Sequence, residues 1–190
     1  MNTRTDYVAI VRDAANKVDG ELQAFDYSER FKGISYAPEN VQMAAIRESA
    51  RNYYVAVRLM SIINVKNAYS QYLLSGAWQG NVALVKYVLK RLDASNKKYL
   101  EEMNEATRIA SARSMIETVV VLLKKGASPS TVNVISIRFV INKQLYWRYP
   151  FDEFIRLFRG RHANMIMKEI NGLPREKCAP IMIILENASI

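Results

Sequence analysis

Apolar residues recur every three or four positions along most of the chain, and polar residues fill the positions between them. This spacing is typical of amphipathic helices, each with one face toward a core. Residues 3–19 form the first such stretch: Thr3 and Asp6 have the spacing of a capping box at its start, and Gly20 suits its end. The same spacing predicts further helices within residues 41–63, as two helices, and within 68–78, 82–92, 94–112, 115–125, 151–159, 163–171 and 181–186.

Two segments do not follow this pattern. Residues 20–37 are less regular and predict a loop that is pinned to the body by its aromatic residues, Phe25, Tyr27, Phe31 and Tyr36. Residues 131–142 are rich in Val and Ile, and their alternation fits either a strand or a buried helix. Ser128 and Pro129 just before them suit a helix N-cap and first turn, so we favour the helix.

The composition supports a helical protein of one domain. Seven Gly and five Pro among 190 residues are few for the many tight turns of a β-sandwich or barrel. Half of the residues are hydrophobic, which is enough for one core. We therefore expect an all-α fold.

An internal repeat indicates how these helices are arranged. Residues 71–96 and 105–130 share one pattern when Gly80 is aligned with Ser114, an offset of 34 residues. The apolar residues that coincide are Val85 with Val119, Val88 with Leu122, and Leu89 with Leu123. A repeat of this length predicts helix pairs that stack on one another.

Small residues in both windows fit such a stack. Close approach of neighbouring helices is favoured by Gly76, Ala77, Ala110 and Ser111. Gly80 would let the chain turn sharply between two antiparallel helices. Gly126 would end a helix in the left-handed conformation, which Gly adopts at the least cost.

The pattern resembles the ankyrin repeat, which has two helices and a period of about 33 residues. The residues that match its consensus are Ala77, Gly80, Val85, Val88 and Leu89 in the first window and Ala110, Glu117, Val119, Leu122, Leu123, Gly126 and Ala127 in the second. Weaker matches extend the resemblance over residues 40–165. Where ankyrin repeats carry a β-hairpin turn, this chain has residues 97–103, which are helical in character. The resemblance implies an ankyrin-like solenoid of stacked antiparallel helix pairs with the β-hairpins shortened or lost.

We expect a single helical-repeat domain over residues 1–190, in three parts. Residues 1–37 would form an N-terminal capping helix and loop, residues 38–165 the repeat core, and residues 166–190 a C-terminal cap. No low-complexity segment or long linker divides the sequence between them.

The chain carries a net charge of +9, and the positive excess is uneven. Residues 1–66 hold 9 basic and 8 acidic side chains, whereas residues 67–190 hold 18 and 10. Such a charge attracts an acidic protein surface or nucleic acid, and it also serves solubility alone. The sequence contains no compact run of Lys or Arg that would single out nucleic acid.

Little in the sequence points to catalysis. The chain has one His, His162, and one Cys, Cys178, so clusters of His or Cys ligands for a metal are excluded. These two residues could be imagined as a nucleophile and its base, but no neighbouring residues indicate activation of the thiol. Glycine-rich phosphate-binding motifs do not occur. We therefore predict no enzymatic activity and no cofactor.

The lone Cys178 also excludes an intramolecular disulfide and indicates a reducing compartment. The longest apolar runs, residues 119–123 and 181–185, fall far short of the ~20 residues that span a bilayer. The N-terminus lacks the apolar stretch of a signal peptide. We expect an intracellular protein, cytoplasmic or nuclear, that is neither secreted nor inserted in a membrane.

The ankyrin resemblance also implies where a partner would bind, because ankyrin proteins usually bind along the concave face of their inner helices. The corresponding positions are Ser75, Trp78 and Gln79 in the first window and Arg108 and Arg113 in the second. A second candidate is a stretch of mixed aromatic and basic residues that includes Trp147, Arg148, Arg156 and Arg159. The two Trp side chains could instead pack in the core.

The sequence thus predicts a non-catalytic protein–protein interaction module with a basic, aromatic-containing concave face for a partner with an acidic surface. Nucleic-acid binding by the basic last two thirds of the chain is the alternative. The loose match to the ankyrin consensus resembles the degenerate repeats of viral and bacterial effector proteins. The identity of the partner and the oligomeric state are not predicted.

Overall fold

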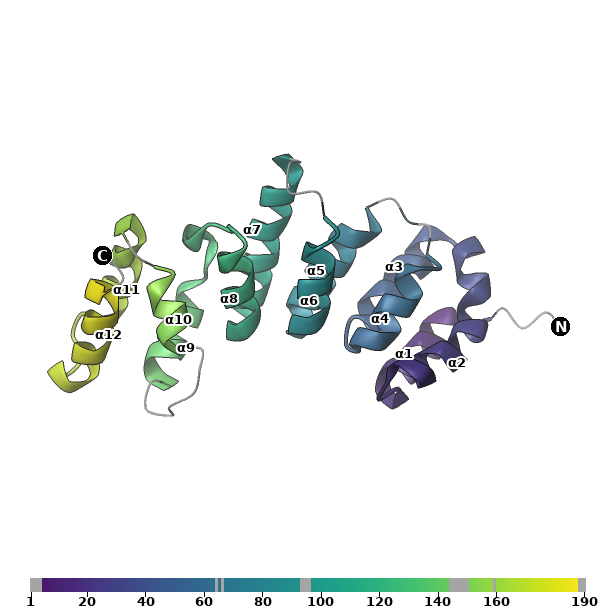
Figure 1. Ribbon diagram of the computed structural model, residues 1–190, viewed down its shortest axis with the longest axis horizontal. Coiled ribbons are helices and arrows are strands. Elements are labelled where there is room, and N and C mark those ends of the chain that lie inside the picture. The colour runs from purple at the N-terminus through teal and green to yellow at the C-terminus, as the bar shows by residue number, and fades with distance from the viewer. Residues whose placement is uncertain are drawn as a thin grey trace. The chain divides into compact units, whose positions relative to one another are not determined.

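The computed structural model of the protein describes residues 5–63, 65, 67–92, 97–143, 151–158 and 160–187. All regular structure in these residues is helical, and no strand occurs among them (Figure 1). The all-α prediction is therefore confirmed. The chain divides into two compact units, residues 1–95 and residues 96–190.

The first unit is built from two layers of helices. Its elements are α1 (Tyr7–Lys17), α2 (Glu21–Phe31), the 3-10 helix η1 (Lys32–Tyr36), α3 (Glu39–Ser49), α4 (Tyr53–Met60), α5 (Ala68–Gln79) and α6 (Val82–Leu89). In one layer α3 contacts both α1 and α5, and in the other α4 contacts both α2 and α6. Odd-numbered and even-numbered helices thus form separate layers.

The small residues expected in α5 lie in close contacts. Gly76 and Ala77 are both buried. A Cβ atom at Gly76 would lie 3.2 Å from Val85 Cγ2 and 3.3 Å from Leu84 Cδ2, which are both on α6. Any side chain at Gly76 would therefore press against α6.

The turn that follows α5 has the same geometry as the turn that follows α7 (Lys97–Ala112) in the second unit. Gly80 and Ser114, which were aligned in the sequence, both have a left-handed backbone, with φ of 69° and 55°. In each turn the next residue donates its N–H over 2.9 Å to the carbonyl five positions earlier, Asn81 to Gly76 and Met115 to Ala110. This hydrogen bond satisfies a carbonyl at the end of each helix.

Two asparagines connect successive helix pairs of the first unit. Asn52 Oδ1 accepts from two N–H groups in the first turn of α4, at 3.0 and 3.2 Å, while Nδ2 donates to Val18 O at 2.6 Å. Asn81 Oδ1 accepts from the first turn of α6 at 3.1 Å, and Nδ2 donates to Ala50 O at 3.0 Å. Each side chain therefore caps its own helix and also binds the turn between the two helices of the preceding pair.

The prediction of a loop over residues 20–37 is wrong, because α2 and η1 occupy most of this segment. The inward face of α2 carries Ala24, Ser28 and Phe31, which are all buried. Only one of these three residues is large and apolar, so the helical spacing of hydrophobic residues is weak here. The aromatic residues do not all anchor the segment either: Phe31 is fully buried, but Phe25 and Tyr36 are 60% and 91% exposed.

The first helix begins later than the sequence suggested. α1 starts at Tyr7, and its N-cap is Asp6, whose carboxylate accepts from Ala9 N at 3.0 Å. Thr3, the expected start of the capping box, lies outside the described residues.

The second unit also has two layers of helices. Its elements are α7 (Lys97–Ala112), α8 (Ile116–Lys124), η2 (Pro129–Thr131), α9 (Val134–Lys143), α10 (Phe151–Arg156), η4 (Gly160–His162), α11 (Ala163–Ile170) and α12 (Arg175–Asn187). In one layer α9 contacts both α7 and α11, and in the other α10 contacts both α8 and α12. Gly126, after α8, has a φ of 105°, as predicted for a helix stop.

Residues 131–142, which fitted either a strand or a helix, are helical from Val134 onwards. A short 3-10 helix that starts at Pro129 precedes them. The buried positions of α9 have helical spacing and are Ser136, Ile137, Val140 and Ile141. The prediction of a helix is therefore confirmed, but only one face of it is buried, since Val134, Ile135 and Phe139 are exposed.

The last helix begins earlier than the expected start at residue 181. α12 begins at Arg175, and Pro180 lies inside it with its ring exposed. A proline inside a helix removes one of its hydrogen bonds, so the residues before Pro180 were not expected to be helical. Ile181 and Leu185, four residues apart, are buried and hold the helix against the unit.

Burial changes the pKa of one tyrosine of the first unit, Tyr72. Tyr72 on α5 is fully buried, and its hydroxyl has no hydrogen-bond partner of good geometry among the described residues. Burial raises the pKa of Tyr72 far above its usual value, and Ser49 offsets the rise only in part. The folded protein therefore keeps this proton at a pH where the unfolded chain, with a pKa of about 10, loses it. This contribution to stability is complete below pH ~10 and is lost as the pH rises further.

We expect Tyr72→Phe to match the wild type in stability at pH 7 and to resist alkaline pH better. Between pH 10 and 12 the free energy of unfolding of the wild type should fall faster than that of the variant by about 1.4 kcal/mol per pH unit. Urea titrations followed by circular dichroism at pH 7, 10, 11 and 12 measure the difference. Parallel pH profiles for the two proteins would contradict the prediction.

Candidate functional site

Three of the residues predicted from the repeat line one hollow in the first unit. This hollow, which we call the α3–α5 cleft, has a volume of about 470 Å³. Its lining residues are Arg47, Glu48 and Arg51 at the end of α3, and Gln71, Leu74, Ser75, Trp78 and Gln79 on α5. The structure therefore brings Ser75, Trp78 and Gln79 together, as predicted, and adds charged residues from a neighbouring helix.

Helix geometry explains why these residues of α5 share one face. Residues three and four positions apart lie on the same side of a helix. The cleft side holds Leu74, Ser75 and Trp78, whereas the opposite side holds Tyr72, Leu73, Gly76 and Ala77, which are buried. The buried side positions α5 against its neighbours and leaves the cleft side open.

The cleft carries more positive than negative charge. Its one carboxylate, Glu48, has a side chain only 17% exposed and contacts two arginines: Arg12 Nη2 lies 3.2 Å from Oε1, and Arg51 Nη2 lies 3.5 Å from Oε2. The hydrogen bond and the charge of Glu48 raise the pKa of Arg12. Arg47 is exposed and forms no ion pair with a described residue. The lining thus holds two guanidinium groups, Arg47 and Arg51, and one carboxylate that also pairs with Arg12, which leaves the cleft suited to an anionic group.

Trp78 gives the cleft an apolar surface. Its side chain is 50% exposed, and Leu74 beside it in the lining is half-buried. A Trp that merely filled the core would be almost fully buried. The half-exposed indole therefore leaves apolar area that a partner can cover, which favours the binding interpretation over core packing.

The other predicted site residues lie in the second unit. Arg108 on α7 is exposed and pairs with Glu105, and Arg113 is exposed just after α7. Arg156 is exposed on α10. Trp147, Arg148 and Arg159 lie outside the described residues, so their role in binding stays a prediction.

The sequence prediction missed the charged side of the cleft. Arg47 and Glu48 lie in the last turn of α3, which ends at Ser49, and Arg51 follows in the turn after the helix. Two arginines four residues apart were a usable signal that both could lie near one helix end. What the sequence did not show is that this helix end adjoins Trp78, because the contact joins two helices that are not neighbours in the chain.

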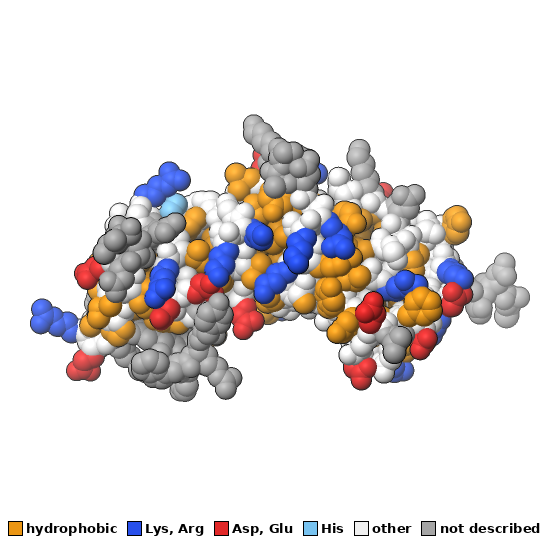
Figure 2. Space-filling model, in the orientation of Figure 1, with side chains coloured by type: hydrophobic (Ala, Val, Ile, Leu, Met, Phe, Trp, Pro, Cys, Tyr) orange, Lys and Arg blue, Asp and Glu red, His pale blue; other side chains and the backbone are white. Residues whose placement is uncertain are grey.

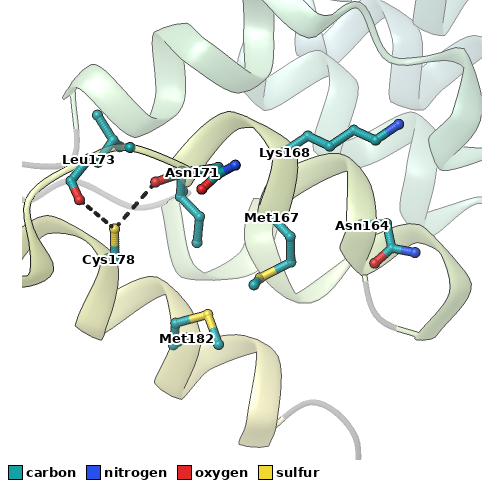
Figure 3. Close-up of a pocket in the computed structure, with 9 residues that line it drawn as sticks. Asn164, Met167, Lys168, Asn171, Leu173, Cys178 and Met182 are labelled. Carbon is teal, nitrogen blue, oxygen red and sulfur yellow. Dashed lines mark hydrogen bonds between the residues drawn. The ribbon is translucent and has the colours of Figure 1, made fainter.

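A second hollow, of about 650 Å³, lies between α11 and α12 of the second unit. Its lining residues are Asn164, Met167, Lys168, Ile170, Asn171, Gly172, Leu173, Cys178 and Met182. Figure 3 shows that Met167 and Met182 extend from the two helices into this space.

Cys178 in this second hollow faces main-chain carbonyls. Its Sγ lies 3.5 Å from Ile170 O and 3.6 Å from Leu173 O (Figure 3). The thiol therefore donates to carbonyl groups at and after the end of α11. His162 has a different contact, since its Nε2 accepts from Arg161 at 3.3 Å. Both groups thus have structural hydrogen bonds in place of the nucleophile–base contact considered from the sequence.

Neither a metal site nor a membrane-spanning helix is found in the described part of the chain. Among its residues, no group of three or more His, Cys, Asp or Glu side chains is arranged to hold a metal ion. No helix within the described ranges is both long enough and apolar enough to cross a membrane.

Comparisons with protein-family models, curated proteins and solved structures found no match.

Proposed function

We propose that the protein is a non-catalytic binding module that holds a segment of an acidic protein partner in the α3–α5 cleft. One observation carries this proposal: the half-exposed ring of Trp78 lies in the same cleft as Arg47 and Arg51. Trp and Arg are the residue types that contribute most to protein interfaces. The partner segment would bring an apolar side chain to Trp78 and a carboxylate to the arginines.

The charges in the cleft support an acidic partner over a neutral one. Arg51 already shares Glu48 with Arg12, and Arg47 has no ion pair with a described residue. A carboxylate of the partner would therefore find two guanidinium groups beside an apolar surface that excludes water. A basic segment would meet repulsion from the same groups, so the cleft discriminates by charge.

The arrangement of helices supports an ankyrin-like stack as the frame of this module. In each unit alternate helices contact one another, and the aligned positions Gly80 and Ser114 turn the chain in the same way. A stack of helix pairs presents side chains of successive inner helices side by side, which is the arrangement found at α3 and α5.

Peptide selection tests the proposal because it requires no identified partner. A library of phage-displayed random peptides would be selected on the full-length protein, and the affinity of enriched peptides measured by fluorescence anisotropy. We expect the enriched peptides to combine Asp or Glu with an aromatic or aliphatic residue. Trp78→Ala and Arg47→Glu should each weaken binding by about tenfold or more, which corresponds to at least ~1.4 kcal/mol.

The control variant is Tyr36→Ala, because Tyr36 is 91% exposed and lies outside the cleft lining. It should bind the selected peptides like the wild type. All three variants should melt within a few degrees of the wild type, since each changes an exposed side chain. Selected peptides that bind both cleft variants with unchanged affinity would refute the assignment of this cleft.

A further inference from the structure

A second surface of the first unit combines aromatic rings with positive charge on the layer of even-numbered helices. We call it the α4–α6 face and define it by Tyr53, Tyr54, Lys86, Tyr87, Lys90 and Arg91. The Tyr53 ring lies 5.4 Å from the Tyr54 ring and 5.8 Å from the Tyr87 ring, at interplanar angles of 70° and 80°. Three tyrosines therefore form one continuous edge-to-face cluster that joins α4 to α6.

Arg91 extends this cluster with a planar cation. Its Cζ lies 3.5 Å from the centre of the Tyr87 ring, and its Nη1 donates to Tyr87 O at 3.3 Å. The guanidinium is therefore held against the ring in an exposed position. Tyr54 is also open to solvent, with 39% of its side chain exposed.

The charge on this face is of one sign. Residues 53–60 and 82–91 contain four basic residues, Arg58, Lys86, Lys90 and Arg91, and no Asp or Glu. Lys86 and Lys90 are exposed and form no ion pair with a described residue. Elsewhere in the first unit, by contrast, Lys17 pairs with Asp13 and Lys32 pairs with Glu29. In the space-filling view, Lys and Arg side chains lie next to hydrophobic ones over the α5–α6 pair (Figure 2).

We propose that the α4–α6 face binds single-stranded nucleic acid. An exposed ring, a guanidinium held over a second, half-buried ring, and cations without an ion pair to a described residue supply the two components of a single-strand site: bases stack on the flat groups, and the cations contact the phosphates. Tyr54 and the Tyr87–Arg91 pair would receive bases, and Lys86 and Lys90 would contact the backbone. A duplex keeps its bases stacked inside, so it would use the lysines alone.

This surface is distinct from the α3–α5 cleft, and the inference does not rest on the proposed function. The cleft is lined by residues of α3 and α5, whereas the rings and cations described here belong to α4 and α6 and the residues that follow α6. An acidic protein segment would also be attracted to the lysines, but it offers no flat bases to stack on the rings. The aromatic cluster therefore favours the nucleic acid.

Binding is measured by fluorescence anisotropy with the full-length protein and labelled 20-nucleotide oligo(dT) and oligo(U) at low salt. The same assay includes a DNA duplex of equal length and a poly-glutamate peptide. We expect the single strands to bind more tightly than either of these. With two or three phosphates neutralised, the logarithm of the binding constant should fall against log salt with a slope of about −1.4 to −2.1.

Two sets of variants localise the binding. Lys86→Glu/Lys90→Glu should weaken single-strand binding by about tenfold or more, and Tyr54→Ala by about fivefold or more. Tyr54→Phe keeps the ring and should restore wild-type affinity. The matched control is Lys17→Glu/Lys32→Glu, which makes the same change in net charge at two exposed lysines outside the face and should cause a clearly smaller loss. Trp78→Ala should bind the oligonucleotides normally.

Three results would overturn the proposal. Equal losses from the two double-lysine variants would show attraction to net charge alone. Unchanged binding by Tyr54→Ala, with the duplex bound as tightly as the single strands, would exclude stacking. Poly-glutamate bound as tightly as oligo(dT) would identify the face as a site for acidic protein instead. Melting temperatures near that of the wild type for each variant make these comparisons valid.

Discussion

Phe31→Ala should lower the free energy of unfolding by about 3–5 kcal/mol, the range typical of a large-to-small change at a buried phenylalanine. The Phe31 side chain is fully buried at the end of α2, and its ring lies 6.4 Å from the ring of Tyr27. Truncation removes this apolar contact and leaves a cavity that the surrounding helices fill only in part. We expect the loss to be large because the other buried side chains that the structure describes on α2, Ala24 and Ser28, are small.

Phe25→Ala is the matched control, since it makes the same chemical change in the same helix. Phe25 is 60% exposed, and the guanidinium of Arg58 lies over its ring, with Cζ 4.6 Å from the ring centre. Its truncation should cost about 1 kcal/mol or less. Urea titrations followed by circular dichroism measure both variants, and the fit allows two transitions because the chain has two compact units. Similar losses for the two variants would mean that α2 does not pack through Phe31.

Asn52→Ala should cost about 2–3 kcal/mol, combining a lost helix cap of about 1–2 kcal/mol with a lost hydrogen bond of about 1 kcal/mol. The Asn52 amide accepts from two N–H groups of α4 and donates to Val18 O at 2.6 Å. Alanine keeps neither role, so both the start of α4 and the carbonyl after α1 lose a partner. The cost of a cap alone would be about half as large.

Asn52→Asp separates these two roles. A carboxylate keeps the acceptor for the first turn of α4 and suits the positive end of the helix. It cannot donate to Val18 O, and it places a negative charge beside that carbonyl. We expect a loss smaller than that of Asn52→Ala but clearly measurable by the same urea titrations. Wild-type stability for Asn52→Asp would show that the bond to Val18 contributes nothing.

Most helices were predictable because their apolar spacing is a local property. The strongly apolar segments that form α6 and α8 were predicted within a few residues of their bounds. Gly80 indicated the turn before α6, and Gly126 indicated the end of α8. α2 was missed because its described buried side chains are Ala24, Ser28 and Phe31, of which only Phe31 is large and apolar. A small or polar residue can face the core when neighbouring helices leave little room, and local spacing does not show that.

The residues of α5 in the candidate site were predicted from the sequence, whereas the arginines beside them were not. The ankyrin resemblance implied that Ser75, Trp78 and Gln79 lie on one face of an inner helix, and the structure puts all three in one cleft. Arg47 and Arg51 were not associated with them, because they belong to another helix whose distance from Trp78 depends on packing. The same limit applies to Tyr53 and Tyr87, which are far apart in sequence and have rings 5.8 Å apart.

The sequence by itself was enough to predict a helical protein, the sharp turn at Gly80 and the helix stop at Gly126, and its composition fixes the net positive charge. The helices and turns follow from residues within one or two helical turns of each other. The open side of α5 was implied by the ankyrin resemblance. Only the tertiary structure shows which charged residues lie beside Trp78 and which tyrosines of α4 and α6 are in contact. Such contacts join helices some thirty residues apart, and their geometry depends on how closely Gly76 and other small residues let the helices approach.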